Sequence, residues 1–278
     1  MAEAKGRWEL GPIERFHKFV TDAHRLLVLS IRGIDRTARS MPVEKALLDY
    51  RLAKENREET DKDRAALKQA ELEAEFANGE VQAGFPLLHA HTLVSMWGAL
   101  EALVEDLAVG WLLNEKDAHK IDVIARVKVP LAEFDALERE ERMRLVVHEV
   151  GRALKTEHRA GIDRFEALLS ALGLGGSVDR EVKRTLYELF QIRNVVVHRA
   201  CIADRRLVEE CARLGLKQGE EVRINHAAYH GYLEAIDAYF TCLLKRLADH
   251  FGVDMKLSDG QACHSCALGC GPVPESTQ

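Results

Sequence analysis

Apolar residues recur along this chain every three or four positions, with charged residues between them. This spacing is typical of helices that bury one face, and isolated glycines and prolines mark the breaks. Two segments depart from it: residues 121–129 favour a short extended piece, and residues 217–225 a turn with a brief strand. We expect helices over residues 12–39, 43–77, 87–113, 130–154, 161–172, 178–198, 204–214 and 226–251. The sequence therefore predicts an all-α protein.

The distribution of charge divides the chain into three regions. Residues 1–83 predict a highly charged helical extension with sparse apolar positions. Within it, residues 43–77 are interpreted as a long solvated helix or helical pair, or alternatively as a coiled-coil surface for a partner. Residues 84–252 carry the strongly apolar helices and predict the folded core. Residues 253–278 contain glycine and serine and little apolar bulk, which predicts a flexible tail.

Composition and charge exclude several classes of protein. With 278 residues, of which 47% are hydrophobic and 30% charged, the chain is typical of a folded soluble protein. A formal net charge of −6 argues against non-specific coating of nucleic acid, which depends on Lys and Arg. The first residues lack the apolar core of a signal peptide, and the apolar segment 92–113 carries Glu101, Glu105 and Asp106, which lipid would penalise. We expect a cytoplasmic protein that does not span a membrane.

Cysteine is concentrated in the last third of the chain, and Cys263, Cys266 and Cys270 gather in the tail beside His264. In a cytoplasmic protein, thiols stay reduced or bind metal rather than form disulfides. A C-x2-C spacing suits zinc, but a structural zinc site usually pairs two such motifs, and a second C-x2-C motif is missing from the sequence. Three interpretations stay open: a metal site within one loop or shared by two chains, a reactive-thiol tail, or an unstructured end.

The stretch QIRNVVVHRA, residues 191–200, places an arginine, an amide and a histidine within an apolar helix. On a helical projection, Arg193 lies at the centre of the apolar stripe, with its apolar neighbours within roughly 60°. Since an arginine cannot lose its proton, a buried Arg193 needs a carboxylate, carbonyl oxygens or an anionic ligand. His198 projects about 140° away, beside Tyr187 and Asn194. Either the helix ends at His198 and turns the ring back, or a second copy supplies the other half of a shared site.

The order of elements around this motif resembles the HEPN superfamily, the higher eukaryotes and prokaryotes nucleotide-binding domain. Its hallmark is R-x4–6-H on a late helix, often with a polar residue after the arginine, here RNVVVH with Asn194. The stretch WGALEALVEDLAVGWL, residues 97–112, looks like the family's early helix, whose acidic residue would be Glu101. The resemblance covers roughly residues 84–251 and implies an up-and-down helical bundle, to which residues 1–83 would be an N-terminal extension.

For function, the resemblance implies a metal-independent endoribonuclease that acts as a homodimer without a cofactor. Arg193 and His198 from two protomers would surround the scissile phosphate while the ribose 2′-hydroxyl attacks it, and Asn194 would orient the imidazole. The residue types fit this chemistry, because a histidine can exchange a proton near neutral pH and an arginine forks onto phosphate oxygens. RNA is then the expected substrate.

Three further residues are expected to support this site or to bind the substrate. Arg199 belongs to an island between residues 179 and 206, where basic residues outnumber acidic ones and would attract RNA, although a solvated helix face explains the same charges. Glu101 is expected as a structural partner of Arg193, as a site residue, or as a surface residue. Tyr187 shares the face of His198 and either lines the site or packs within the bundle.

Other interpretations stay open. A non-catalytic HEPN module would bind RNA, a nucleotide or a partner protein, and a plain helical scaffold would bind through its charged N-terminal helices. As a nuclease the protein would act as a toxin or defence effector, and the family resemblance then implies a nucleotidyltransferase-like antitoxin. For so short a motif, the ordinary interpretation is a structural arginine and a solvated histidine.

Overall fold

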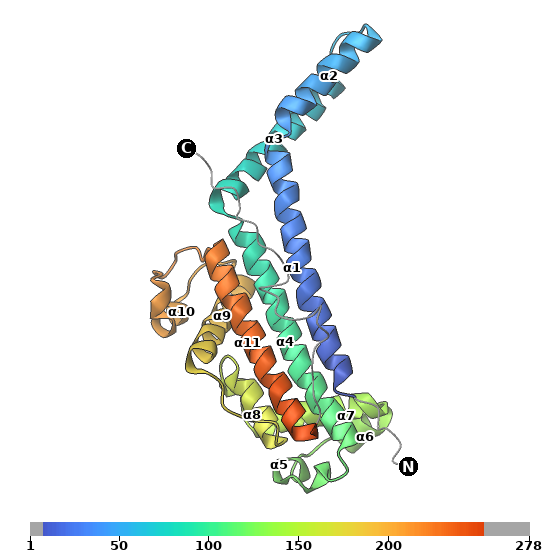
Figure 1. Cartoon of the computed structure of the whole chain (residues 1–278), viewed down its shortest axis with the longest axis vertical. Coiled ribbons are helices and arrows are strands. Elements are labelled where there is room, and N and C mark those ends of the chain that lie inside the picture. The colour runs from blue at the N-terminus through green and yellow to red at the C-terminus, as the bar shows by residue number, and fades with distance from the viewer. Residues whose placement is uncertain (1–7, 253–278) are drawn as a thin grey trace.

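The computed structural model describes residues 8–252, which fold almost entirely into helices (Figure 1). The α-helices are α1 (Leu10–Ala38), α2 (Met41–Glu55), α3 (Asp61–Ala83), α4 (Pro86–Asn114), α5 (Asp122–Ala125), α6 (Leu131–Ala136), α7 (Arg139–Ala153), α8 (Asp163–Ala171), α9 (Arg180–Arg199), α10 (Arg205–Glu210) and α11 (His226–Phe251). Short 3-10 turns are η1 (Ala118–Lys120), η2 (Thr156–His158) and η3 (Ala212–Leu214). No strand forms within the described residues, so the prediction of an all-α protein is confirmed.

Helices α1, α4 and α11 run side by side along the length of the molecule and form a packed bundle with α9 (Figure 1). The short helices α5 to α8 gather at one end of this bundle, and α10 lies beside α9. At the other end, α2 and the first part of α3 form a hairpin that projects away from the bundle. The second part of α3 returns along α1, and the amide of Asn78 donates to the carbonyl oxygen of Ala38 at 3.1 Å.

The core centres on α4, which is apolar on nearly all sides. Trp97 of this helix is fully buried, and its ring lies 5.7 Å from the ring of Phe190 in α9. On another side of the core, Phe16 of α1 lies 4.8 Å from Phe240 of α11. Burying each such side chain stabilises the fold by roughly 1.5–3 kcal/mol. Helix α1 therefore shares one core with the helices that follow residue 84.

Side-chain caps explain where several helices begin. Asp179 accepts hydrogen bonds from the amides of Glu181 and Val182 at the start of α9, at 2.8 and 3.2 Å. Asn225 caps α11 by accepting from the amide of Ala228 at 2.8 Å. Each cap satisfies amides that lack a partner within the helix, which is worth about 1 kcal/mol. The starts of α9 and α11 are thus encoded by residues next to each helix.

Three sequence predictions about local structure are wrong in detail. The helix expected over residues 130–154 is broken at Glu138, which adopts an extended backbone and forms a capping box with Glu141, so that α7 begins anew. The extended piece expected at residues 121–129 is instead the helical turn α5. The brief strand expected within residues 217–225 is reduced to one isolated antiparallel bridge between Ile202 and Glu221.

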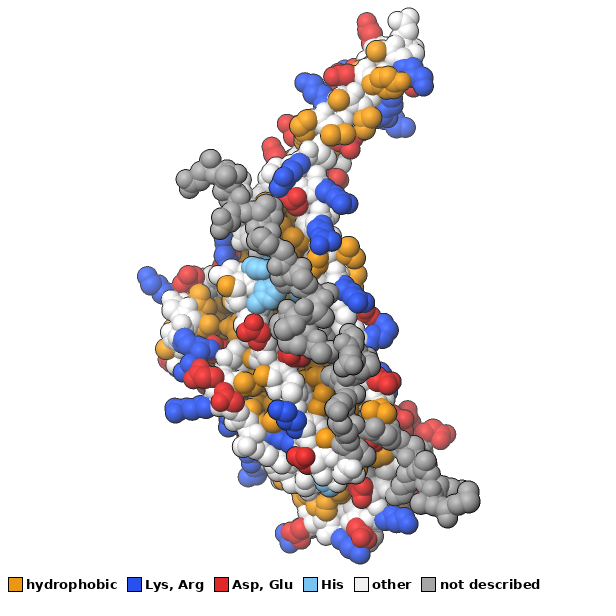
Figure 2. Space-filling view, viewed as in Figure 1, with side chains coloured by type: hydrophobic (Ala, Val, Ile, Leu, Met, Phe, Trp, Pro, Cys, Tyr) orange, Lys and Arg blue, Asp and Glu red, His pale blue; other side chains and the backbone are white. Residues whose placement is uncertain are grey.

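The surface mixes acidic and basic side chains over most of the viewed face (Figure 2). In the described part of the chain, every helix is too short or too polar to cross a membrane. Histidine side chains gather on the same face at the end of the bundle from which the hairpin projects.

An ion pair between the buried carboxylate of Glu188 and the exposed side chain of Arg213 holds α9 against the segment after α10. The carboxylate of Glu188, only 5% exposed, accepts from Nε and Nη2 of Arg213 at 2.8 and 2.6 Å. The replacement Arg213→Ala should lower the free energy of unfolding by about 3 kcal/mol, because it leaves the buried carboxylate of Glu188 without its charged partner. Chemical denaturation measures this difference.

The matched control is Arg205→Ala, whose ion pair with Glu209 is long and exposed at 3.6 Å. An exposed pair of this kind contributes at most about 0.5 kcal/mol. Equal losses of stability in the Arg213→Ala and Arg205→Ala variants would contradict the structural role given to the pair between Arg213 and the buried carboxylate of Glu188.

Candidate functional site

The R-x4-H motif occupies the last two turns of α9, which stays regular through His198 and ends at Arg199. The chain then turns sharply, because Ala200 and Cys201 both have positive φ values, of 50° and 65°. This conformation costs a residue with a side chain about 1–2 kcal/mol. The amide of Cys201 donates to the carbonyl oxygen of Val195 at 3.2 Å and closes the helix end. The helix therefore does not end early to turn the histidine ring back toward Arg193.

Arg193 lies at the edge of the buried face of α9 rather than at its centre, so this part of the sequence prediction is wrong. The buried residues of the helix are centred on Ile192 and include the polar residues Glu188 and Gln191. Arg193 follows about 100° further round the helix and is only partly buried. A projection of apolar residues misplaced the centre, because two polar side chains are buried through partners outside the helix.

The guanidinium of Arg193 makes one side-chain hydrogen bond within the described residues, from Nη1 to Oδ1 of Asn194 at 3.4 Å. No carboxylate of the described chain forms an ion pair with it. Nearby arginines differ in this respect, since Arg206 pairs with Glu210 at 3.1 Å and Arg213 with Glu188 at 2.6 Å. Arg193 is therefore a partly buried cation whose counter-charge does not come from the described chain.

His198 is exposed at the end of α9, and Arg199 beside it is exposed as well. Within the described chain neither side chain forms an ion pair or a side-chain hydrogen bond. Cations at the last turn of a helix are favoured by the partial negative charge of the free carbonyl groups. Both side chains are thus free to meet a ligand or a second molecule.

Tyr187 and Gln191 precede Asn194 and His198 on the same stripe of α9, but they are held by α10. The hydroxyl of Tyr187 and the amide of Gln191 both donate to the carboxylate of Glu210. Burial and this hydrogen bond raise the pKa of Tyr187 above its ordinary value, so the phenol remains a donor. Helix α10 therefore covers the first half of the stripe and gives Tyr187 a structural role there.

Glu101 is not the partner of Arg193 in the structure. Its carboxylate accepts from Nε1 of Trp97 at 2.9 Å and pairs with Nη1 of Arg164 at 3.2 Å. The ion pair with Arg164 joins α4 to α8. The role expected for Glu101 as the structural partner of Arg193 is therefore wrong, because its carboxylate pairs with Arg164 instead.

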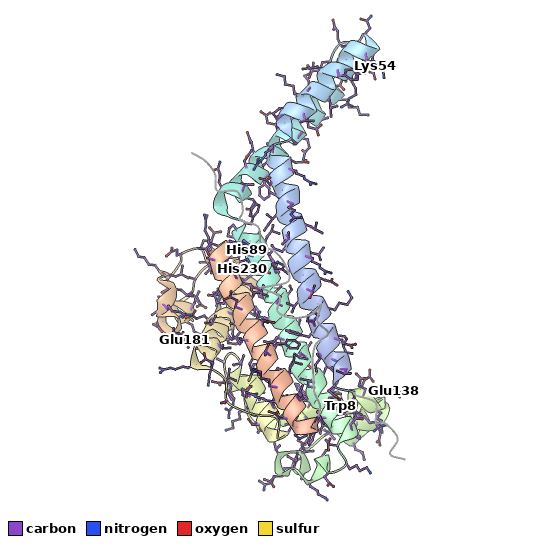
Figure 3. The ribbon with its side chains drawn as sticks, viewed as in Figure 1. Trp8, Lys54, His89, Glu138, Glu181 and His230 are labelled. Atoms are coloured by element: carbon purple, nitrogen blue, oxygen red, sulfur yellow. The ribbon has the colours of Figure 1, made fainter. Side chains whose placement is uncertain are left out.

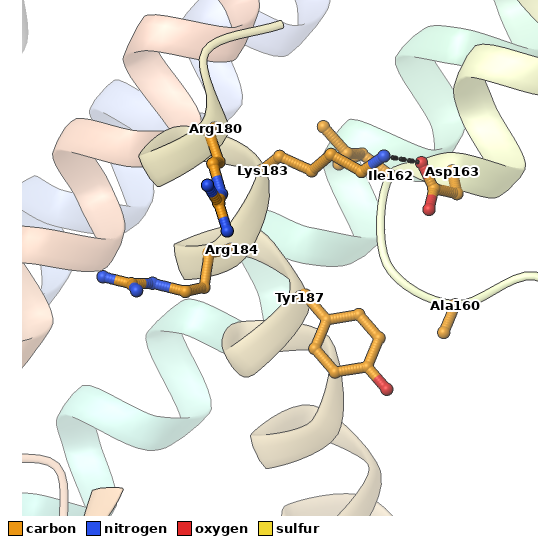
Figure 4. A pocket seen from close by; sticks show the side chains of 7 residues that line it. All are labelled: Ala160, Ile162, Asp163, Arg180, Lys183, Arg184 and Tyr187. Atoms are coloured by element: carbon orange, nitrogen blue, oxygen red, sulfur yellow. Dashed lines mark ion pairs between the residues drawn. The ribbon is translucent and has the colours of Figure 1, made fainter. Parts of the chain in front are cut away.

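A pocket of about 400 Å³ opens at the other end of α9, against the start of α8 (Figure 4). Arg180, Lys183, Arg184 and Tyr187 line it from α9, in the basic island expected from the sequence. Local pairs neutralise part of this charge, since Lys183 binds Asp163 at 2.7 Å and Arg184 binds Glu181. The island is therefore less positive than the count of its basic residues indicates.

A cluster of four histidines, His24, His89, His226 and His230, was not foreseen from the sequence. They come from α1, α4 and α11. His24, His89 and His230 surround the ring of Tyr229, whose hydroxyl lies 2.9 Å from Nδ1 of His24, and His226 contacts His89 and His230. Figure 3 shows His89 and His230 at the same end of the bundle. The one sequence signal for the cluster is the spacing of His226 and His230, which puts them on successive turns of α11.

His89 is buried and donates from Nδ1 to the carbonyl oxygen of Ile224 at 3.1 Å, while its Nε2 has no hydrogen-bond partner in the described chain. Burial, aided by His226 and His230, lowers the pKa of His89 to about 4. In the unfolded chain the ordinary pKa is about 6.5. Between these values the unfolded chain binds more protons than the folded protein, so stability falls as the pH falls.

As the pH drops from 6.5 to 4, we expect His89 to lower the free energy of unfolding by about 3 kcal/mol. At higher pH this residue should not affect the free energy of unfolding. Denaturation at a series of pH values measures the slope. The replacement His89→Gln should flatten the slope, whereas His158→Gln, at an exposed position, should not change it. An unchanged slope in His89→Gln would contradict a buried neutral imidazole.

Within residues 8–252, no three His, Cys, Asp or Glu side chains come together in a way that could hold a metal ion. Cys263, Cys266 and Cys270 lie outside the described residues, so the metal interpretation of the tail is untested. No protein-family model matches the chain, and neither a curated protein nor a solved structure is significantly similar to it.

Proposed function

We propose that this protein is a metal-independent endoribonuclease of the HEPN type, with Arg193 and His198 as its catalytic pair. The observation that carries the proposal is the guanidinium of Arg193, partly buried beside Asn194 and without a carboxylate partner in the described chain. A cation in this state favours an anionic ligand, because desolvation makes an unpaired charge unfavourable. A phosphate diester supplies the missing charge and offers two oxygens to the fork of the guanidinium.

The reaction requires one group that moves a proton and one that stabilises charge. His198 takes the proton from the ribose 2′-hydroxyl, whose oxygen attacks the adjacent phosphorus. Arg193 stabilises the additional negative charge on the phosphate oxygens in the transition state. The bond to the 5′-oxygen of the next nucleotide breaks, and that oxygen receives a proton. The products are one strand with a 2′,3′-cyclic phosphate and one with a 5′-hydroxyl.

The proposed active form is a homodimer with the R-x4-H motif at its interface. Arg193 and His198 point to different sides of one regular helix, so a single chain does not aim both at one phosphate. Two apolar side chains beside the motif are exposed on the surface, Val197 by 48% and Ile202 by 42%. Exposed apolar groups at this position favour contact with a second copy, which would bring an arginine and a histidine of different protomers together.

The second candidate is a non-catalytic HEPN module that binds RNA, a nucleotide or a partner protein. It is favoured by the separation of Arg193 and His198 on α9, if no second copy brings them together. Such a module would bind its ligand without turnover.

The test is incubation of purified protein with a mixture of RNAs in the presence of EDTA. We expect cleavage into fragments with 2′,3′-cyclic phosphate and 5′-hydroxyl ends, and expression of the intact gene should slow bacterial growth. RNA that is bound but never cut would support the non-catalytic module instead. RNA that is neither bound nor cut, with growth unaffected, would remove both nucleic-acid interpretations.

A further inference from the structure

The pocket between the start of α8 and the start of α9 combines an apolar interior with a cationic rim (Figure 4). Ile162 is buried, and Ala160 and the ring of Tyr187 are half-buried, so the inner lining is mainly apolar. The cations that line it from α9 are exposed, with Arg180 at the first position of the helix. Its volume of about 400 Å³ lies in the range of sites for small molecules. Such a pocket suits a ligand that has one apolar part and one anionic part.

The walls of this pocket are held in place from both sides. On α9, the hydroxyl of Tyr187 donates to the carboxylate of Glu210 and accepts from Nε2 of Gln191 at 3.0 Å. On the other side, the loop before α8 approaches the same residue at Gly161, whose φ is 59°. A Cβ atom at Gly161 would lie only 3.1 Å from Cα of Tyr187, so the close approach requires glycine. Because ring and loop are both fixed, the pocket exists before a ligand arrives, which lowers the cost of binding.

The charges around the pocket leave one cation without a counter-charge. Lys183 pairs with Asp163 at 2.7 Å, and Arg184 pairs with Glu181. Within the described residues Arg180 forms neither an ion pair nor a side-chain hydrogen bond. Three cations and two carboxylates therefore leave one positive charge in excess, at Arg180. A free guanidinium at the rim of a pocket suits a phosphate group, because its fork binds two phosphate oxygens at once.

The ring of Tyr187 supplies the second element of recognition. Its hydroxyl is occupied by Glu210, so the face of the ring is what the residue offers to the pocket. Aromatic rings of this kind stack against the planar bases of nucleotides. An aliphatic anion would use the guanidinium of Arg180 but gain nothing from the ring. A nucleotide uses both, because it carries a phosphate group and an aromatic base.

We propose that the pocket between α8 and α9 binds one nucleotide, with the phosphate group on Arg180 and the base against the ring of Tyr187. A free mononucleotide and one unit of a single-stranded RNA supply the same chemistry. Arg180 precedes Arg193 by thirteen residues, or about 20 Å along α9, so a single nucleotide does not reach both arginines. The site is thus separate from the R-x4-H motif, and this inference does not rest on the proposed ribonuclease activity.

The experiment is calorimetric titration of the full-length protein with four probes: adenosine 5′-monophosphate, adenosine, inorganic phosphate, and an octamer of 2′-O-methyl adenosine. We expect binding of the monophosphate at one site per chain, and binding of adenosine and of inorganic phosphate that is at least about tenfold weaker. An octamer that binds more tightly than the monophosphate would identify an RNA strand as the source of the nucleotide. Equal affinities would identify the free nucleotide.

Single replacements test each half of the site. Arg180→Glu should lower the affinity for the nucleotide by about 10–100-fold, and the fold should be kept, because an acidic residue is favoured in the first turn of a helix. The matched control is Arg205→Glu, which changes an exposed arginine that follows a capping aspartate, Asp204, at the start of α10. It should bind the nucleotide as the wild type does. Tyr187→Leu should lower the affinity by about tenfold, whereas Tyr187→Phe, which keeps the ring, should retain most of it.

Three results would overturn the proposal. The first is a wild-type protein that binds neither the monophosphate nor the octamer. The second is an Arg180→Glu variant that binds both probes as tightly as the wild type, which would place the ligand elsewhere. The third is inorganic phosphate that binds as tightly as the monophosphate, which would show an anion site without recognition of a base. The methylated octamer lacks the attacking 2′-hydroxyl and is not cleaved, so these readouts do not depend on the proposed ribonuclease activity and the two proposals fail independently.

Discussion

Replacement of His198 by alanine should lower the rate of RNA cleavage by about 10²–10⁴-fold, the range associated with loss of a general acid–base group. The exposed position of the ring means that the replacement removes no packing, so the melting temperature should stay within about a degree of the wild type. Cleavage of a labelled RNA under single-turnover conditions measures the effect. The variant should also relieve the growth defect caused by the intact gene.

The matched control is His250→Ala, which removes an exposed histidine from the last turn of α11, outside the R-x4-H motif. Its cleavage rate should equal that of the wild type. The pH profile adds a second readout: the pH dependence of the rate should differ between the wild type and His198→Ala, because the variant lacks the group that transfers the proton. Equal rates in wild type and His198→Ala would show that this residue has no part in cleavage.

Replacement of Arg193 by glutamine should lower the cleavage rate by about 10²–10³-fold, the usual effect of losing one group that stabilises charge in the transition state. Glutamine keeps part of the volume of the partly buried side chain, so stability should change little. Arg193→Lys should recover little activity, because an ammonium group does not fork onto two phosphate oxygens. The control is Arg205→Gln, an exposed arginine that is already paired with Glu209.

Mixing the Arg193→Gln and His198→Ala variants tests the shared site directly. If each site takes its arginine from one protomer and its histidine from the other, a mixed dimer contains one intact site, and the mixture should recover part of the wild-type rate. Recovery requires exchange of subunits, which size-exclusion chromatography of a tagged and an untagged chain monitors. No recovery despite exchange would place both residues of each site in one protomer, against the proposed interface.

Several helices could be predicted because their signals are local. The apolar spacing lies within the helices themselves, so the ends of α9 and α11 were predicted to within two residues. The break at Glu138 was missed, because the pattern of apolar residues continues across it while one extended residue restarts the helix. One residue with an extended backbone does not change the spacing of apolar residues, so the hydropathy pattern does not reveal it.

The candidate site could likewise be predicted only in part from the sequence. The motif and its place at the end of a late helix could be found from the sequence. The depth of Arg193 could not, because it depends on which faces of α9 meet α4 and α11, and on partners such as Arg213 that let Glu188 be buried. The ion-pair partner of Glu101 could not be predicted either, because Arg164 is brought to it by the packing of α8 against α4.

Helical content, the breaks at glycine and proline, and the residues able to carry chemistry were thus encoded locally, in spacing and side-chain type. The partners of those residues were not, because ion pairs and hydrogen bonds join positions far apart in the chain: His24 meets Tyr229 across 205 residues, and Arg213 meets Glu188 across 25. Such contacts arise only when the helices pack, since packing sets which polar side chains lose water and must find each other. That is why the all-α class followed from the sequence, while the unpaired state of Arg193 and the histidine cluster emerged only from the packed helices.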